Sequence, residues 1–419
     1  MVRRPMDVAP ARVSFPDVGL GRGWEPPVLL ALTLMLFAFG LVTLYSASSF
    51  FARTQGNPDH FYVLRQATGG AVGLVALAVC ARIPFRFWET MAWPLVVATF
   101  ALLVVVILPG TEGIAPRING ARRWLQVGVT IQPSEFAKIA MIVWTAMMAV
   151  RKQDQFGRLS KGLGPFLAIW GLLLIPVALQ PDLSTAMLTG LLGALTLFAA
   201  GARIGHFIFL AIICAPVLAQ QLLVGFRFDR WIAWLSPTAD SQGAGWQLWQ
   251  SLIAVGSGGL TGRGFGEGQQ KFGFVPEPHN DFIFAMVGEE WGLMGVTFVI
   301  VMYTALILIG FRVARRAPTL FGQLLAVGCT NLIALQAVLH ISVGLGLVPT
   351  TGLALPLVSY GRSNLLVIFI AIGILMSIAR ETDLDWSPDT RERTRRSDLT
   401  RDVRRAGPRA RPATAGGRG

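Results

Sequence analysis

Residues 246–290 read WQLWQSLIAVGSGGLTGRGFGEGQQKFGFVPEPHNDFIFAMVGEE. A polar, glycine-rich segment passes here through the cluster 276–281 and continues directly into an apolar run that begins at Phe282. Lipid tolerates charged side chains only where they face a polar interior. The junction therefore predicts that Asp281 lies at the mouth of a membrane span and faces whatever the preceding loop encloses.

The whole chain has the composition of a membrane protein. Its 419 residues are 53% hydrophobic and 14% charged, with a mean hydropathy of +0.57, whereas soluble domains are about 25% charged. Most of its apolar blocks reach the roughly 20 residues that a spanning helix needs. The blocks lie near 27–49, 64–82, 91–109, 134–150, 163–180, 184–201, 206–224, 282–311, 319–347 and 363–380. The sequence predicts an all-α integral membrane protein with about ten transmembrane helices, the fifth and sixth divided only by residues 180–182.

The loop charges predict the orientation, because positively charged loops stay in the cytoplasm. Both termini are then cytoplasmic. Basic residues gather in the N-terminal arm and in alternate loops, at Arg82, Arg86, Arg151, Lys152, Arg158, Lys161, Arg203, Arg312, Arg315 and Arg316. The segments predicted to lie outside are 46–63, 110–133, 225–281 and 348–362, and the large loop 225–281 joins the seventh and eighth spans.

This topology divides the chain into three parts. Residues 1–26 form a cytoplasmic arm, 27–380 the membrane domain, and 381–419, rich in Arg, Asp, Pro and Gly, a disordered basic cytoplasmic tail. The net charge of +13 follows from cytoplasmic loops that meet anionic lipid, so no nucleic acid is expected as a partner. The first apolar block lacks a small-residue cleavage site and is interpreted as a retained signal anchor.

Two outer segments carry side chains that suit an amphiphilic ligand. Arg122 and Arg123 stand beside Trp124; guanidinium forks suit a pyrophosphate, and snorkelling to lipid headgroups is the alternative. Residues 246–255 place Trp and aliphatic side chains on one helical face. This predicts a short interfacial helix with its aromatic face toward lipid, either as an anchor or as a grip on a polyprenyl chain.

Further charged residues lie at predicted helix starts and inside a span. Glu135 and Lys138 are three apart behind Pro133 and can pair on one face, which predicts a structural pair that shapes a cavity. Asp182 precedes Leu-Ser-Thr and is expected to cap a helix. Glu289 falls near the face of Asp281 about 12 Å deeper, which predicts a hydrated groove that runs inward.

Zinc and nucleotide sites are not expected. His279 and His340 have no ligand partners at useful spacing. The three cysteines all lie in apolar blocks and are interpreted as core residues. The glycine-rich stretch 256–268 follows no strand and lacks a Gly-Lys-Ser/Thr ending, which argues against a phosphate loop.

Taken together, residues 27–380 resemble the SEDS family (shape, elongation, division and sporulation), with its FtsW, RodA and SpoVE branches, and most of all FtsW. The combination and order of these motifs are specific to that family. They are Tyr45-Ser46-Ala47-Ser48, Asn119-Gly120-Ala121-Arg122-Arg123-Trp124, Gln132-Pro133-Ser134-Glu135, Gln180-Pro181-Asp182-Leu183, residues 250–260, Pro276-Glu277-Pro278-His279-Asn280-Asp281-Phe282-Ile283-Phe284, Gly288-Glu289-Glu290 and Pro356-Leu357-Val358-Ser359-Tyr360-Gly361.

The resemblance implies a peptidoglycan glycosyltransferase that polymerises lipid II at the outer face of the bacterial inner membrane, at the division site. The implied partners are a class B penicillin-binding protein and other divisome membrane proteins. Asp281 matches the family's essential carboxylate and is the expected general base. The expected substrate-binding residues are Arg122, Arg123, Trp124, Lys271 and Glu289. The cofactor is left open, with a divalent cation such as Mg²⁺ as one option.

Alternatives and departures remain at this point. A lipid II flippase would use the same polar path, a RodA-type elongation polymerase or a sporulation role would share the motifs, and a non-catalytic scaffold would not need Asp281. The chain also departs from the family pattern at Arg362, Asn364, His340 and Asn280. Arg362 places a cation where the family keeps a small residue, so that loop either contacts phosphate or is less mobile.

Overall fold

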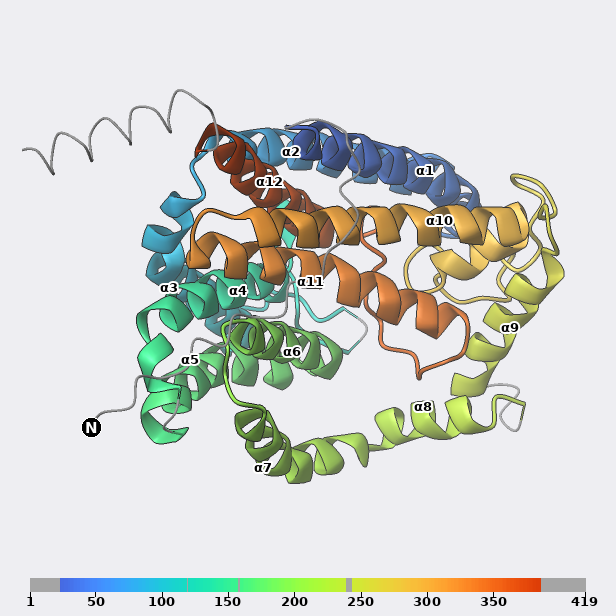
Figure 1. The fold of residues 1–419 in the computed structure, drawn as a ribbon. Coiled ribbons are helices and arrows are strands. Elements are labelled where there is room, and N and C mark those ends of the chain that lie inside the picture. The colour runs from blue at the N-terminus through green and yellow to red at the C-terminus, as the bar shows by residue number, and fades with distance from the viewer. Residues whose placement is uncertain (1–22, 119, 157–158, 239–242, 386–419) are drawn as a thin grey trace, which may run out of the picture.

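The structure is a computed structural model that describes residues 23–118, 120–156, 159–238 and 243–385 (Figure 1). Most of the predicted cytoplasmic arm and almost all of the predicted basic tail lie outside these described residues. The described chain is a bundle of long helices with a small hairpin and two short helices at one end. The expected all-α membrane fold is confirmed.

The helices follow the predicted apolar blocks closely. They are α1 (Glu25–Thr54), α2 (Phe61–Arg82), α3 (Arg86–Ile107), α4 (Pro133–Arg151), α5 (Leu159–Leu179), α6 (Leu183–Ala199), α7 (Ile204–Leu222), α8 (Gly225–Leu235), α9 (Ala244–Ser257), α10 (Ile283–Arg316), α11 (Leu320–Gly344) and α12 (Arg362–Asp385), with a 3₁₀ turn at Gln153–Gln155. Within the described residues, nine helices are long and apolar enough to cross a membrane, and the apolar α6 is shorter at 17 residues. The count of ten spans stays a prediction, with α6 as the tenth.

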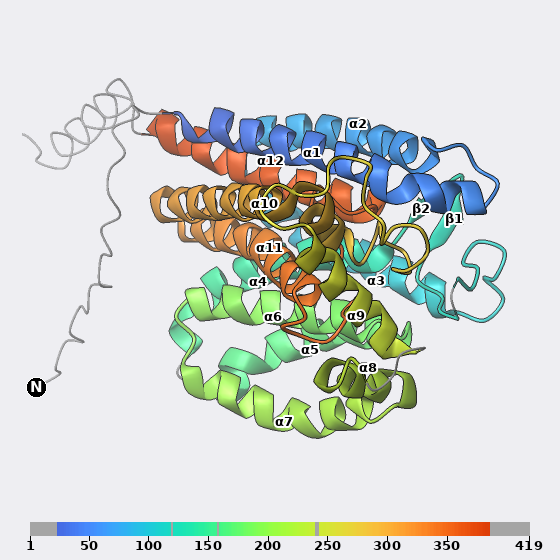
Figure 2. The same cartoon turned by 90° about the vertical axis from the view of Figure 1, so that its right-hand side faces the viewer.

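The bundle is built around α4, which packs against α3, α6, α11 and α12. In its apolar stretch 83% of the residues are buried, including Trp144 and Met141, because helices surround it on every side. A second layer is formed by α12 along α2 and by α1 along α10 (Figure 2). The core therefore consists of side chains contributed by helices from both halves of the sequence.

The two ends of the described chain lie at the same end of the bundle. Glu25, at the start of α1, accepts a hydrogen bond from Nε of Arg312 (3.1 Å) and pairs with Arg316 at the end of α10. Glu381, near the end of α12, accepts from the backbone N–H of Phe85 (3.0 Å), whose ring stacks near Phe321 at the start of α11. We call this the Arg316 end, and the opposite end the Asp281 end.

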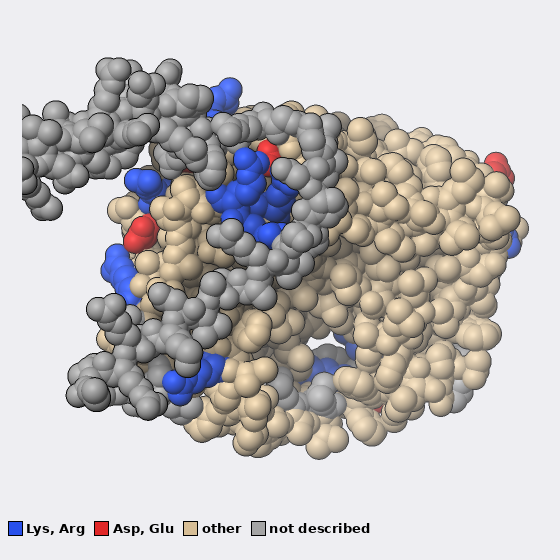
Figure 3. All heavy atoms as spheres, viewed as in Figure 1, with Lys and Arg blue, Asp and Glu red and all other residues tan. Residues whose placement is uncertain are grey.

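Helix α7 is only loosely attached to the bundle. Only 6% of its apolar stretch is buried, and Ile204, Ile208 and Ile212 are each more than half exposed. The ribbon runs from α7 into α8 at a distance from the central helices (Figure 1). A space-filling view shows a hollow above this segment with basic side chains visible inside it (Figure 3).

The predicted loop 225–281 contains two helices. The expected helix over 246–255 is confirmed as α9, in which Trp249 and Ile253 are exposed and Leu248 and Ala254 are buried against neighbouring elements. The amphipathic helix α8 was not predicted. The segment is therefore a folded cap over the Asp281 end more than a simple loop.

The span predicted over 282–311 is not one continuous helix, because Gly292 within α10 has φ 61° and ψ −156°. The backbone groups that this break frees are bonded by the glycine-rich segment 259–264. The N–H groups of Arg263 and Gly264 donate to the carbonyls of Glu289 (3.0 Å) and Glu290 (3.1 Å), while those of Leu293 and Met294 donate to the carbonyls at 259 (2.9 Å) and 260 (3.1 Å). Unpaired backbone groups cost several kcal/mol in lipid, so this exchange stabilises the broken helix.

The connection between α3 and α4 forms a small hairpin. Strands β1 (Leu125–Val127) and β2 (Val129–Ile131) pair antiparallel around Gly128, whose φ is 69°. The backbone N–H of Gln132 then donates to the Ser363 hydroxyl (3.0 Å) at the start of α12. This hairpin, which the helical pattern did not predict, fixes the residues just before it over the Asp281 end.

Candidate active site

Asp281 is held in place by the backbone that precedes it. The carbonyl of His279 accepts from the backbone N–H of Tyr360 (3.1 Å), and that of Asn280 accepts from the Ser359 hydroxyl (2.9 Å). The same hydroxyl accepts from the backbone N–H of Leu355 (2.9 Å). The segment 355–361 thus fixes the segment 277–281, and Asp281 enters α10 from a defined position.

The imidazole of His279 is enclosed by aromatic side chains. It is 3% exposed and lies against the rings of Tyr62 (4.6 Å between centroids), Phe51 (4.9 Å) and Tyr360 (5.9 Å). Burial lowers the pKa of His279 to about 4, so the ring is neutral at pH 7. A neutral ring enclosed by aromatic side chains supports the loop that carries Asp281 and does not supply a cation.

The carboxylate of Asp281 is available for chemistry. Among the described residues it makes no hydrogen bond or ion pair, and its side chain is partly buried beside Gly352. The pKa of Asp281 is raised to about 6, mainly by burial and also by the negative charge of Glu277, while the cations Arg230 and Arg123 oppose the rise. A carboxylate with a pKa close to the working pH and without a protein partner suits a general base.

Three arginines from two separate segments converge on the same region. Arg123 donates to the carbonyls of residues 180 (3.1 Å) and 181 (2.7 Å) in the α5–α6 turn. Arg230 donates to the carbonyl of Thr350 (3.3 Å), and Arg227 donates to the carbonyl of Gln221 (3.2 Å). Burial lowers the pKa of Arg227, and the nearby cations Arg123 and Arg230 lower it further. The region around Asp281 is therefore cationic and matches an anionic group of a ligand.

Arg227 and Arg230 were missed by the sequence interpretation. They lie three apart on α8, and Trp231 and Trp234 follow them one turn later on the same helix. The indole N–H of Trp234 donates to the carbonyl of Gly346 (2.9 Å). Their signal was present: arginines in a segment predicted to be outside contradict the positive-inside trend, and their spacing is helical. Only the fold shows that they meet Arg123 over Asp281.

The predicted arginine pair is divided in the structure. Arg122 turns away toward the end of α3, where it donates to the carbonyl of Leu108 (3.1 Å) and pairs with the exposed Glu112. Arg123 belongs to the cationic group around Asp281. Trp124 is partly buried between Arg123 and β1. The structure thus brings one of the two arginines to the candidate site.

Glu289 and Lys271 lie in a different place, which we call the clasp: Ser46, Lys271, Glu289 and Glu290. The Glu289 carboxylate accepts from the backbone N–H groups of residues 269 (2.7 Å) and 270 (3.2 Å). Lys271 donates to Glu290 (2.8 Å), to the Ser46 hydroxyl (2.7 Å) and to the carbonyl of residue 266 (2.7 Å). All three Lys271 donors are therefore used within the protein.

The prediction of a hydrated groove from Asp281 to Glu289 is wrong. Glu289 is fully buried because the break at Gly292 allows the segment 259–271 to cover it. The expected substrate contacts of Glu289 and Lys271 stay predictions, and the clasp leaves neither side chain an open face.

Glu135, Lys138 and Asp182, which were predicted to have structural roles, make the predicted ion pair and helix cap. Lys138 pairs with Glu135 (2.7 Å) in the core, and Asn364 donates to the other Glu135 oxygen (2.8 Å). The Asn364 departure thus has a partner inside the bundle. Asp182 accepts from the backbone N–H of Thr185 (3.3 Å) and caps α6. Arg362 contacts the backbone of α2 at Gly69 through its aliphatic stem.

Within the described chain, no group of three or more His, Cys, Asp or Glu side chains could hold a metal ion. Asp281 and Glu277 are close enough for their charges to interact. These two carboxylates are the acidic side chains that a cation at this site would meet.

A bundle of apolar helices with a carboxylate and arginines under a folded cap defines a multi-pass membrane protein with a polar site at one end. Residues 27–384 match the family described as "Cell cycle protein", FtsW/RodA/SpoVE. The chain belongs to this family.

Curated relatives cover most of the chain. A probable peptidoglycan glycosyltransferase FtsW of Geobacter sulfurreducens is 39% identical over 354 residues, 84% of this chain and 94% of the relative. Stage V sporulation protein E of Bacillus subtilis is 38% identical over 355 residues, 84% of this chain and 96% of the relative. The two branches are matched almost equally.

Solved structures share the fold. A chain of the structure described as "Structural coordination of polymerization and crosslinking by a peptidoglycan synthase complex" superposes with a TM-score of 0.70 at 26% identity, covering 87% of this chain and 99% of that chain. The rod shape determining protein RodA of Thermus thermophilus superposes with a TM-score of 0.62 at 25% identity, covering 87% and 98%.

Proposed function

We propose that this chain is a peptidoglycan glycosyltransferase that polymerises lipid II, with Asp281 as its general base. The observation that carries the proposal is the partnerless carboxylate of Asp281, held by a fixed backbone beside Arg123 and Arg230. The names of the FtsW relatives support the reaction class. Because several of the curated relatives are named FtsW, septal synthesis is the preferred role and RodA-type elongation the alternative, although a sporulation relative matches the chain almost equally well.

The geometry fits the chemistry of glycan elongation. A hydroxyl of one lipid-linked sugar attacks the anomeric carbon of another, a new glycosidic bond forms, and the bond to the polyprenyl pyrophosphate breaks. The hydroxyl proton passes to the Asp281 carboxylate, which its raised pKa makes a better proton acceptor. Arg123, Arg227 and Arg230 supply cationic donors for the pyrophosphate that leaves.

The loose packing of α7 offers a route for the substrate. A lipid-linked sugar must bring its headgroup to Asp281 while its polyprenyl chain stays in the bilayer. The side of α7 that is not covered by other helices, together with the hollow above it in which basic side chains are visible (Figure 3), is the proposed route from the lipid to the site. A flippase would need a second polar opening at the Arg316 end.

The proposed setting is the outer leaflet of the bacterial inner membrane at the division site. The likeness to a chain of a peptidoglycan synthase complex supports a class B penicillin-binding protein as the partner, with other divisome membrane proteins around it. A Mg²⁺ ion would find Asp281 and Glu277 as ligands, and substrate phosphates and water would complete its shell. It would supply further positive charge for the pyrophosphate.

Polymerisation by the purified chain tests the proposal. The protein is incubated with lipid II, with and without a class B penicillin-binding protein, with Mg²⁺ or with a chelator, and the products are separated by size. Glycan polymer that is absent with heat-denatured protein is expected. Translocation of lipid II across vesicles without any polymer would support the flippase instead.

The orientation is tested separately on intact spheroplasts. A cysteine at exposed Glu267 should react with an impermeant thiol reagent, and one at Arg315 should not, because Arg315 lies at the predicted cytoplasmic end. The reverse labelling would place Asp281 in the cytoplasm and contradict polymerisation outside the cell.

A further inference from the structure

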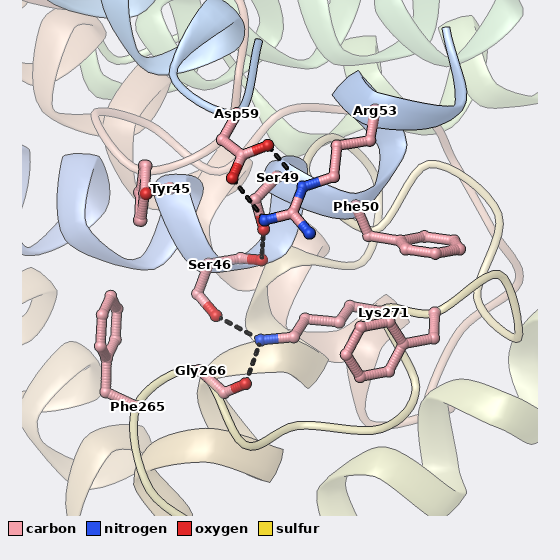
Figure 4. A pocket seen from close by; sticks show the side chains of 10 residues that line it. Tyr45, Ser46, Ser49, Phe50, Arg53, Asp59, Phe265, Gly266 and Lys271 are labelled. Atoms are coloured by element: carbon pink, nitrogen blue, oxygen red, sulfur yellow. Dashed lines mark hydrogen bonds and ion pairs between the residues drawn. The ribbon is translucent and has the colours of Figure 1, made fainter. Parts of the chain in front are cut away.

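A pocket of about 230 Å³ lies beside the outer half of α1, away from the Asp281 carboxylate (Figure 4). Four aromatic rings form its walls, and the polar groups of Ser46, Ser49, Arg53, Asp59 and Lys271 line the remainder. The aromatic residues are Tyr45, Phe50, Phe265 and Phe272. We call it the α1 pocket; the proposed reaction does not use it.

The depth of the α1 pocket follows from the length of α1. From Glu25, paired with basic residues at the Arg316 end, to Tyr45 the helix rises about 30 Å, which is the thickness of the hydrocarbon core. Tyr45 therefore lies at the far interface, and Arg53 lies two turns further on, among the headgroups. Exposed aromatic rings are typical of this level.

Apolar surface continues from the pocket into the hydrocarbon. Val42, one turn below Tyr45 on α1, is 44% exposed. Leu293 and Met294 are 54% and 67% exposed and follow Trp291, whose ring contacts the pocket residue Phe265. Acyl chains of a lipid seated in the pocket would lie along these side chains.

The charges of the pocket are balanced, and only one pair can reach a ligand. Lys271 is 5% exposed in its side chain and is neutralised by Glu290, with all its donors used. At the rim, two nitrogens of Arg53 donate to the two oxygens of Asp59, and the Arg53 side chain is 66% exposed. The rim thus offers one cation and one anion side by side.

We propose that the α1 pocket binds the headgroup of a zwitterionic phospholipid that carries a phosphate and a primary amine. The phosphate oxygens accept from the Arg53 guanidinium, while the amine donates to Asp59 beside the Tyr45 ring. The Ser49 hydroxyl donates to the carbonyl of Ser46 (3.2 Å) and stays bonded within the protein. A net anionic headgroup would leave Asp59 next to negative charge, and a quaternary amine has no N–H to donate.

Lipid retention by the purified full-length chain tests this assignment. Native mass spectrometry counts bound lipid during titration with phosphatidylethanolamine, phosphatidylglycerol and phosphatidylcholine of identical acyl chains. We expect one phosphatidylethanolamine to bind at least about fivefold more tightly than the other two, as two charge-assisted hydrogen bonds allow. Arg53→Ala and Asp59→Ala should each reduce this preference to less than about twofold.

Two further variants separate the pocket from general surface charge. Arg65→Ala removes an exposed arginine on the neighbouring α2, outside the pocket, and should keep the preference. The double variant Arg53→Asp, Asp59→Arg preserves an ion pair with reversed polarity and should lose it, with an unchanged unfolding temperature. Equal retention of the three lipids by the wild type, or a preference that survives Arg53→Ala and Asp59→Ala, would overturn the proposal.

Discussion

The short helix between Asp281 and the break at Gly292 has carboxylates near both of its ends, and the protein treats them differently. Asp281 has no partner within the described residues and a raised pKa. Glu289 and Glu290 are buried and receive loop N–H groups, the Ser46 hydroxyl and the Lys271 ammonium. The difference shows that the fold leaves the first of these carboxylates a free acceptor and gives the other two protein partners.

The same comparison explains the stability of the two regions. A buried charge without a partner is costly, and the clasp meets that cost with direct hydrogen bonds. At Asp281 the compensation is partial, because Arg123 and Arg230 act from a distance and remain able to meet a ligand. Substrate binding is then expected to complete the polar contacts of the site.

The sharpest test of this comparison replaces one carboxylate at each end with an amide. Asp281→Asn should lower the polymerisation rate by roughly 10²–10⁴-fold without lowering the unfolding temperature, because the amide keeps the size, loses the basicity and removes a costly buried charge. Glu289→Gln should leave the rate per folded molecule nearly unchanged and lower the stability by about 1–3 kcal/mol, because its amide nitrogen would face the N–H of residue 270. Rates and thermal unfolding of both purified variants check this.

The opposite result for either variant would contradict this comparison of the two carboxylates. A Glu289→Gln variant that folds normally and loses polymerisation would place Glu289 in the reaction. Near wild-type polymerisation by Asp281→Asn would remove the general base from its assigned position and favour a scaffold role.

A second test addresses the packing that closes the clasp. A Cβ on Gly258 would lie 1.9 Å from the carbonyl oxygen of Gly288, whereas a Cβ on Gly256 would meet nothing within 4 Å. Gly258→Ala should therefore destabilise the protein by about 1–3 kcal/mol or more and reduce its abundance in the membrane. Gly256→Ala, two residues earlier and inside α9, should match the wild type; equal abundance of the two variants would show that the segment 259–271 can detach without loss.

The sequence predicted the parts of the fold that depend on local pattern. The apolar blocks, the start of α4 at Pro133, the cap at Asp182 and the division of α5 from α6 are set by neighbouring residues, and the structure confirms them. The break at Gly292 was not predictable in this way. It lies within an apolar run, and its hydrogen-bond partners come from residues about 30 positions earlier.

The candidate site was only partly predictable for the same reason. Asp281 stood out because polar residues adjoin an apolar helix. Arg227 and Arg230 did not, since their meeting with Arg123 depends on how α8 folds over the bundle. The prediction that Arg122 and Arg123 act as a pair was wrong, because neighbouring side chains in an irregular segment contact different partners.

The third prediction uses that divided pair. Arg123→Lys keeps the charge but loses the fork that binds two carbonyls, so polymerisation should fall about tenfold. Arg122→Lys should stay within about twofold of the wild type, because its ion pair with Glu112 is exposed and such pairs contribute little. The rate as a function of lipid II concentration, at matched membrane abundance, measures both; a larger loss for Arg122→Lys would reverse the assignment.

The last and smallest effect is on the pH dependence of polymerisation. Asp281 must be ionised to accept a proton, so with a pKa of about 6 the rate should fall as the pH decreases through 6. The negative charge of Glu277 raises that pKa and the positive charge of Arg230 lowers it.

Glu277→Gln should therefore move the acidic limb to lower pH, and Arg230→Gln should move it to higher pH, each by roughly half a unit to one unit. Asn280→Ala, at the neighbouring position, changes no charge and should leave the limb in place. Profiles of kcat/KM between pH 4.5 and 8 separate the cases, because a limb that moves in the same direction for both charge variants would belong to a group other than Asp281.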